Sequence, residues 1–132
     1  MLVQGAGPVG LTALLMARAA GAAEVLISDV RADQLDLAAS LSAAAIFDAA
    51  DPDLAALARD RAGGPLDVAI DCSGAESAVR AAIAATRPGG TVVLVGMGAA
   101  EMQLPILDVA AAFATVQNLT SGAIKVIVDV GS

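Results

Sequence analysis

The sequence predicts a doubly wound parallel α/β sheet of six strands in the order 3-2-1-4-5-6. Short apolar runs alternate with helix-forming segments along the chain, a pattern typical of right-handed βαβ units. The run Thr91–Val95 is continuously apolar, as expected of a parallel strand that is covered on both faces. A glycine cluster at Gly5, Gly7 and Gly10 joins the first apolar run to the first helical segment.

The composition limits the classes of protein to which the chain can belong. The chain has 132 residues, the length of one domain, so we expect residues 1–132 to form a single domain. Hydrophobic residues make up 58% of the sequence, which is ample for a core. The net charge of −7 disfavours nucleic acid and anionic membranes as partners. We expect neither a transmembrane helix nor a signal peptide, because long uncharged apolar runs and a basic leader are missing.

The expected elements follow one another at short intervals. Strands are predicted at Leu2–Gln4, Glu24–Asp29, Ala45–Phe47, Asp67–Asp71, Thr91–Val95 and Lys125–Val130. Helices are predicted at Pro8–Ala20, Ala32–Ser42, Pro52–Ala62 and Glu76–Thr86, and a longer one opens at Pro105 and closes at Ser121-Gly122. Arg87–Gly90 is predicted to be a turn.

Specific residues set the helix ends. Pro8 suits the first turn of a helix, where its missing N–H costs nothing, and Gly21 is a suitable C′ residue. Asp51 followed by Pro52 predicts an N-cap and a first helical residue. The first helix is apolar on nearly all sides, which predicts that it is buried.

The glycine cluster has the spacing G-x-G-x-x-G, and each glycine has a physical role if the segment is strand, turn and helix. Gly5 permits a tight turn, Gly7 has no Cβ to keep a pyrophosphate from the backbone, and Gly10 lets the helix pack closely on the sheet. The helix N-terminus offers N–H groups and a partial positive charge to phosphates. The alternative is a glycine turn before a buried helix, with no ligand.

Asp29 ends the second predicted strand, 19 positions after Gly10. This is close to the spacing of the acid that binds the adenosine ribose in dinucleotide-binding domains. Arg31 could instead contact a 2′-phosphate, but a carboxylate at the strand end repels that phosphate, so NAD is favoured over NADP. The alternative for Asp29 is a solvated strand-end residue.

Other reactive side chains carry weaker predictions. Cys72 is the only cysteine and is expected to be a small buried side chain rather than a reactive thiol. It has no partner for an internal disulfide, so a reducing compartment, the cytoplasm, is expected. The chain has no histidine. Imidazole catalysis, nucleophilic catalysis by a histidine-activated Ser28 or Ser73, and histidine-ligated metals are therefore excluded within it. Asp67 and Asp71 lie too far apart along a strand for a catalytic carboxylate pair, and we interpret them as strand-end residues.

Several separated motifs, in the right order, resemble one family. The segments Gly5–Leu11, Ala19–Ala22 and Val25–Asp29 resemble the coenzyme-binding Rossmann domain of the zinc-dependent medium-chain dehydrogenases. Asp71–Glu76 and Arg87–Gly98 are similar to the sorbitol (polyol) dehydrogenase branch. The resemblance runs from about Leu2 to Ala111.

The resemblance implies a nucleotide-binding oxidoreductase domain, with NAD(H) as cofactor and oxidation of a secondary alcohol to a ketone in the parent enzyme. It implies that Gly5–Gly10 hold the pyrophosphate, Asp29 the ribose, Cys72–Gly74 the adenosine half and Val95–Met97 the nicotinamide half. The full set of expected cofactor-binding residues is Gly5, Gly7, Pro8, Val9, Gly10, Asp29, Val30, Arg31, Gln34, Cys72, Ser73, Gly74, Val95, Gly96 and Met97.

The chain also departs from the family pattern. The catalytic domain that supplies the zinc ligands is missing, and one cysteine without histidine cannot form a family-type zinc site. Gln34 stands where the family usually has a basic residue, and the family pattern is lost after about Ala111. We therefore expect an excised, trimmed or redesigned coenzyme domain, or a gene fragment, without catalytic or metal-binding residues and without turnover alone.

Two further functions stay open at this point. The chain could be a dehydrogenase subunit that another chain completes, or a nucleotide-sensing or S-adenosylmethionine-binding module.

The last predicted strand alternates Lys125, Ile127 and Asp129 with valines and is expected at one edge of the sheet. It could pair with its own copy in a homodimer, and the alternative is a monomer whose edge these charges protect.

Overall fold

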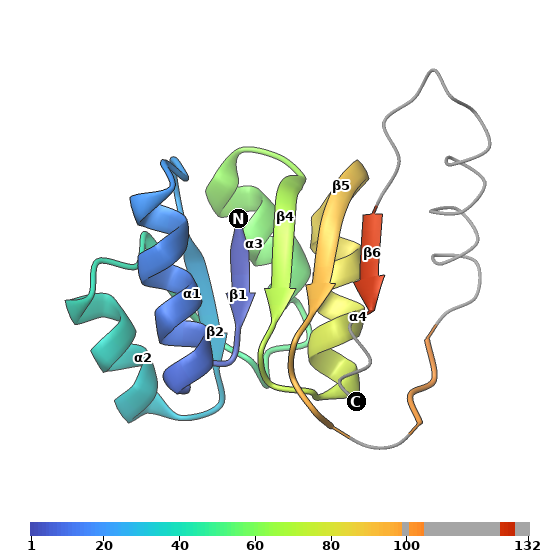
Figure 1. Cartoon of the computed structure of the whole chain (residues 1–132), viewed down its shortest axis with the longest axis horizontal. Helices are drawn as coiled ribbons and strands as arrows, with labels where there is room; N and C mark the ends of the chain where they lie inside the picture. Colours follow the sequence, from blue (N-terminus) through green and yellow to red (C-terminus); the bar gives the residue numbers. More distant parts are fainter. Residues whose placement is uncertain (99–100, 105–124, 129–132) are drawn as a thin grey trace.

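The computed structural model describes residues 1–98, 101–104 and 125–128 (Figure 1). The strands are β1 (Leu2–Gln4), β2 (Leu26–Asp29), β3 (Ala45–Asp48), β4 (Leu66–Asp71), β5 (Thr86–Leu94) and β6 (Lys125–Val128). The helices of this part are α1 (Pro8–Ala19), α2 (Ala32–Ser40), α3 (Leu54–Ala62) and α4 (Glu76–Ala85).

The strands form one parallel sheet in the order β3-β2-β1-β4-β5-β6. The order β3-β2-β1-β4-β5 confirms the predicted parallel α/β architecture and is Rossmann-like. The backbone of β6 pairs with β5 from Thr91 beside Lys125 to Leu94 beside Val128. Residues 129–130 of the predicted last strand, and the helix expected to open at Pro105, lie outside the described residues.

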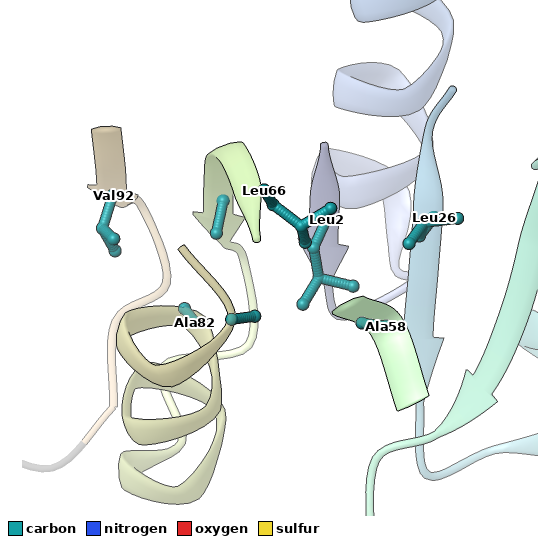
Figure 2. Packing of buried hydrophobic residues seen from close by; sticks show 8 residues of the cluster. Leu2, Leu26, Ala58, Leu66, Ala82 and Val92 are labelled. Carbon is teal, nitrogen blue, oxygen red and sulfur yellow. The ribbon is translucent and has the colours of Figure 1, made fainter. Parts of the chain in front are cut away.

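Two apolar cores hold the helices on opposite faces of the sheet. On one face, Val3 and Ile27 of the strands pack with Leu14 of α1 and Ala38 of α2. On the other, strand side chains pack against alanines of α3 and α4, and Figure 2 shows this cluster: Leu2, Leu26, Leu66 and Val92 face Ala58 and Ala82. Because alanine is small, these helices lie close to the sheet.

The prediction that α1 is buried on nearly all sides was wrong. Gly10 and Leu14 are its buried residues, while Val9 is 55% and Met16 is 65% exposed. The helix lies against one face of the sheet, so only one stripe of it contacts the core. No helix of the described part is both long and apolar enough to cross a membrane.

Several boundaries differ from those predicted. Helix α3 begins at Leu54, because Asp51 forms a turn in which its carboxylate accepts the Asp53 N–H at 2.8 Å. Strand β5 begins at Thr86, so the predicted turn at Arg87–Gly90 lies inside the strand as a bulge. Leu66 pairs with Thr86 whereas Val68 pairs with Thr91, and the intervening residues loop out.

Candidate functional site

The carboxyl ends of the parallel strands meet at one edge of the sheet (Figure 1). The chain leaves β1 toward α1 on one face and leaves β4 toward α4 on the other, and β1 and β4 are neighbours. This is the topological switch point, where open α/β sheets bind their ligands. The predicted site residues lie in the segments that follow β1, β2, β4 and β5.

The turn after β1 has the geometry that its glycines predict. Gly5 has φ +93°, which favours glycine, and its N–H donates to the Ser28 carbonyl at 2.8 Å. A Cβ on Gly10 would lie 1.7 Å from the Gly5 carbonyl oxygen, so α1 can approach the turn only because this residue is glycine. A Cβ on Gly7 would meet nothing within 4 Å. The space beside Gly7 is therefore open to a ligand.

The N-terminus of α1 points into this open space with its donors free. Gly7 is the N-cap, Pro8 begins the helix, and no acidic residue stands in the first turn. The first intrahelical bond goes from the Leu11 N–H to the Gly7 carbonyl, which leaves the N–H groups of Val9 and Gly10 without an intrahelical acceptor. Such an end attracts anions, phosphates in particular.

The carboxylate of Asp29 fastens the end of β2 to the glycine turn. One oxygen accepts the Ala6 N–H at 2.7 Å and the other accepts the Arg31 N–H at 2.9 Å. A carboxylate can accept about four hydrogen bonds, so each oxygen keeps capacity for a ligand hydroxyl. Asp29 is half-buried and lies beside the turn rather than in open solvent.

The guanidinium of Arg31 is turned toward Asp33. The sequence allowed Arg31 to contact a 2′-phosphate, but in this structure its side chain pairs with a carboxylate. Its Nη2 lies 2.5 Å and its Nε 3.1 Å from the two carboxylate oxygens of Asp33. This hydrogen bonding raises the pKa of Arg31 and lowers the pKa of Asp33. Gln34 is half-buried in the first turn of α2.

Sequence reasoning missed the role of Asp71, which it interpreted as a plain strand-end residue. The side chain is fully buried, and its carboxylate accepts the Ser73 hydroxyl at 2.7 Å, the Ser73 N–H at 3.0 Å and the Gly74 N–H at 3.1 Å. These donors compensate for the burial of the carboxylate and fix the turn after β4. A carboxylate two residues before a Ser-Gly pair at a strand end was the available signal.

The same residue connects the turns after β4 and β5. The backbone carbonyl of Asp71 accepts the N–H groups of Val95 at 2.8 Å and Gly96 at 2.9 Å. The two turns are in backbone contact, since a Cβ on Gly96 would lie 2.1 Å from the Gly74 nitrogen and one on Gly98 would lie 1.7 Å from the Gly74 oxygen. The glycines after β5 are therefore required for this close approach.

Cys72 has the environment of a structural thiol. It is half-buried, and its N–H donates to the Gln4 carbonyl at 2.7 Å. Burial, with a smaller effect of the nearby Asp71 carboxylate, raises the pKa of the thiol to about 11. The thiolate is scarce at neutral pH, which disfavours a nucleophilic role.

A pocket of about 270 Å³ opens between the glycine turn, the end of β2 and the turn after β4. Its lining residues are Gln4, Gly5, Ser28, Asp29, Val30, Ala49, Ser73, Ala75, Ser77 and Ala78. Small side chains form much of this wall, and Gln4 and Ser28 are almost completely buried in it.

Large apolar side chains are exposed around this edge. Val30 is 74%, Val95 49% and Met97 94% exposed. They lie among the segments expected to hold the two halves of a dinucleotide. Among the described residues, no group of three or more acidic or cysteine side chains could hold a metal ion.

The structure thus brings most of the predicted site residues together. Contacts join the glycine turn to Asp29, the glycine turn to Ser73, and Asp71 to Val95 and Gly96. Arg31 follows Asp29 at this edge, but its side chain is held by Asp33. The cofactor-binding role of each residue stays a prediction.

Comparison with known proteins identifies relatives that match most of the chain. Residues 8–130 match the model of a family described as zinc-binding dehydrogenase. Sorbitol dehydrogenase of Mus musculus is 41% identical over 113 residues, which cover 83% of this chain and 32% of that protein. The chain therefore spans about a third of the length of the curated relatives that it matches.

Solved structures give the same picture of the fold. The 2R,3R-butanediol dehydrogenase of Bacillus subtilis aligns with 96% of this chain and 34% of its own, with a TM-score of 0.78 and 26% identity. A protein of Sinorhizobium meliloti 1021, described as a zinc-binding dehydrogenase bound to NADP, aligns with 83% of this chain and 33% of its own, with a TM-score of 0.71 and 29% identity.

Proposed function

Because the chain belongs to the zinc-binding dehydrogenase family, in the sorbitol and polyol dehydrogenase branch, we propose that it is a domain that binds NAD(H). The observation that carries this proposal is the hydrogen bond between the Asp29 carboxylate and the Ala6 N–H at 2.7 Å. It sets a carboxylate suited to ribose hydroxyls directly beside a turn suited to phosphates.

The pyrophosphate would lie over the turn from Gly5 to Gly10. The open space beside Gly7 lets phosphate oxygens reach the backbone, and the free N–H groups of Val9 and Gly10 are suitable donors. No acidic side chain in the first turn of α1 opposes the negative charge. The expected pyrophosphate position thus fits the residues that are present.

The two ends of the cofactor would lie on either side of this turn. The pocket between Asp29, Val30 and Ser73 suits the adenosine half, and its small lining residues leave room for a flat ring. The exposed apolar side chains of Val95 and Met97 would contact the nicotinamide half, with nearby backbone groups holding its carboxamide. When bound, NAD supplies a hydride acceptor.

We propose NAD rather than NADP as the preferred cofactor. The Asp29 carboxylate accepts hydrogen bonds from two ribose hydroxyls but repels a 2′-phosphate. The guanidinium of Arg31, two residues after Asp29, could offset this repulsion, but it forms an exposed ion pair with Asp33. The NADP-bound relative is a reason to test both cofactors.

We further propose that these 132 residues alone do not oxidise alcohols. Alcohol oxidation needs a Lewis acid or a base at the hydroxyl, and this chain has no histidine and a single cysteine whose thiol has a raised pKa. A dehydrogenase completed by another chain is the alternative. Incubating the purified chain with sorbitol, NAD and zinc distinguishes the two, since zinc-dependent formation of NADH by the chain alone would refute this proposal.

A thermal-shift series tests the binding proposal itself. We expect NAD to raise the melting temperature, NADP to raise it less, and S-adenosylmethionine to leave it unchanged. A shift with S-adenosylmethionine and none with NAD would favour the alternative of an S-adenosylmethionine-binding module.

Assembly and location are proposals as well. Strand β6 lies at the edge of the sheet, so its backbone can pair with a second copy in a homodimer, and a monomer is the alternative. Sedimentation at micromolar concentration decides between them, because a single monomeric species excludes the edge-paired dimer.

We propose the cytoplasm as the location of the protein, because the single cysteine suits a reducing compartment.

A further inference from the structure

The chain that leaves β5 is attached to the turn after β4 at two points. The backbone carbonyl of Asp71 accepts the N–H groups of Val95 at 2.8 Å and Gly96 at 2.9 Å. The backbones of Gly74 and Gly98 are in contact, with no room for a Cβ on either residue. The first residues after β5 are therefore fixed to the turn that leads into α4.

A third attachment joins Gln103 to an ion pair on α4. Glu76 and Arg80 lie one helical turn apart, and the Arg80 guanidinium donates to the Glu76 Oε1 atom at 2.8 and 3.0 Å. The other oxygen of Glu76 accepts the Gln103 N–H at 3.0 Å, and Arg80 donates to the Gln103 carbonyl. This Glu76–Arg80 clamp thus binds both backbone polar groups of one residue.

The clamp is more than a surface ion pair. An exposed pair of this spacing contributes little to the stability of a helix. Here the anion accepts a backbone N–H and the cation donates to a backbone carbonyl, so both bonds to Gln103 are charge-assisted. The hydrogen bond from Gln103 and that from Arg80 lower the pKa of Glu76, so its carboxylate is charged at neutral pH.

Helix α4 is a fixed support for the clamp. Val79 and Ala82 are buried, and Ala82 packs in the core beneath the sheet. The Gln4 Nε2 atom donates to the Ala78 carbonyl at 2.6 Å and so ties the first turn of α4 to β1. Gln103 is therefore held by a helix that is itself anchored to the central strand.

The attachments leave apolar side chains after β5 open to a ligand. Val95 is 49% and Met97 is 94% exposed. Both are expected to contact the nicotinamide half of the cofactor. A segment that must become ordered around a ligand lowers the affinity, whereas a segment already held in place does not.

We propose that Glu76 and Arg80 are positioning residues for the nicotinamide half of the cofactor, because they hold Gln103 and with it the chain after β5. This inference rests on the proposed function. Neither side chain contacts the cofactor in this role. The competing explanation is an ion pair that stabilises α4 alone, which would not distinguish ligands with and without nicotinamide.

Calorimetric titration with NAD and with ADP-ribose, which lacks nicotinamide, tests this role. We expect the unmodified chain to bind NAD about tenfold more tightly than ADP-ribose. Glu76→Ala and Arg80→Ala should each weaken NAD binding about fivefold and change ADP-ribose binding less than about twofold. The double variant should lose no more than either single variant, because both side chains act through Gln103.

Arg61→Ala is the matched control. Arg61 forms an ion pair with Glu24 at the opposite edge of the sheet, and its side chain is 43% exposed, as is that of Arg80. It also donates to a backbone carbonyl, that of Ala44 at 3.2 Å. Its loss should leave both affinities unchanged.

Hydrogen exchange at the Gln103 amide tests the clamp itself. In Glu76→Ala this N–H loses its acceptor, so it should exchange faster than in the unmodified chain and in Arg61→Ala. An unchanged exchange rate overturns this inference.

The titrations separate this inference from the proposed function. If NAD binds no more tightly than ADP-ribose to the unmodified chain, this inference alone fails. It also fails if the variants keep their affinity for NAD, or if they lose affinity equally for both ligands. Absence of binding to either ligand overturns the proposed function and this inference with it.

Discussion

The carboxylate of Asp29 accepts a hydrogen bond from the backbone N–H of Ala6, a contact of 2.7 Å between residues 23 positions apart. It holds the end of β2 against the turn after β1. Ala6 is fully buried, so without Asp29 its N–H would have to find another partner. One side chain thus shapes the turn and offers its remaining acceptor capacity at the expected ribose position.

Substitutions of Asp29 separate these two roles. Asp29→Asn keeps an acceptor for the Ala6 N–H but removes the charge, so we expect NAD binding to weaken about tenfold and the preference over NADP to shrink. Asp29→Ala should also lower the free energy of unfolding by about 1–3 kcal/mol. Titration and urea unfolding measure the two effects, with the exposed Asp36→Asn as control. Equal affinities of the unmodified chain for NAD and NADP would contradict the assigned role.

Gly7 and Gly10 should respond differently to alanine. The Cβ of Gly10→Ala would lie 1.7 Å from the Gly5 oxygen, so α1 must move, and we expect a loss of at least about 2 kcal/mol in unfolding free energy. Gly7→Ala meets nothing within 4 Å and should cost less than about 1 kcal/mol as an N-cap change. It should nevertheless weaken NAD binding, because its methyl group stands where the pyrophosphate would approach. Unimpaired binding by Gly7→Ala would place the phosphates elsewhere.

Asp71→Asn should destabilise the turn after β4. The amide would turn an N–H toward one of the donors that the carboxylate now accepts from Ser73 and Gly74, leaving a buried donor unpaired. We expect a loss of about 1–3 kcal/mol in unfolding free energy. Asp67→Asn on the same strand is the control and should change little, because Asp67 is exposed and forms only a surface ion pair with Arg87. Similar effects of the two changes would contradict the role given to Asp71.

The thiol of Cys72 should react slowly in the folded chain. Burial raises its pKa from 9.0 to about 11, so the thiolate fraction at pH 8 falls about 100-fold relative to an ordinary thiol. Alkylation by iodoacetamide should therefore be far slower in the native chain than in urea, and should accelerate as the pH rises toward 11. A fast reaction at neutral pH would show an accessible thiolate and contradict the structural role.

Local sequence signals were sufficient for the strand order from β1 to β5 and for the glycine turn. The contact that requires glycine at position 10 lies within the turn, at the Gly5 carbonyl oxygen, and glycine readily adopts the +93° φ found at Gly5. The exposure of α1 was not predictable in this way. Apolar residues surround that helix, and only the fold shows which stripe of them faces the sheet.

The missed features depend on pairing between distant segments. Asp67 and Asp71 have the same residue type on one strand, yet only Asp71 meets the donors of the next turn and of the segment after β5. The bulge in β5 similarly follows from its register with β4, where Val68 pairs with Thr91. The Gln4 Oε1 atom has no partner among the described residues, which could not be predicted for the same reason, because it depends on the packing of α4, where the Ala78 carbonyl accepts a hydrogen bond from the Gln4 Nε2 atom.

Titrating the isotope-labelled chain with NAD, while its backbone amides are followed by NMR, tests whether the glycine turn holds the cofactor. We expect saturable binding of one NAD per chain, with the largest chemical-shift changes at Gly7, Val9 and Gly10 and further changes at Ser73 and Gly96. Absence of saturable shifts, or shifts confined to the opposite edge of the sheet around Glu24 and Pro65, would contradict it.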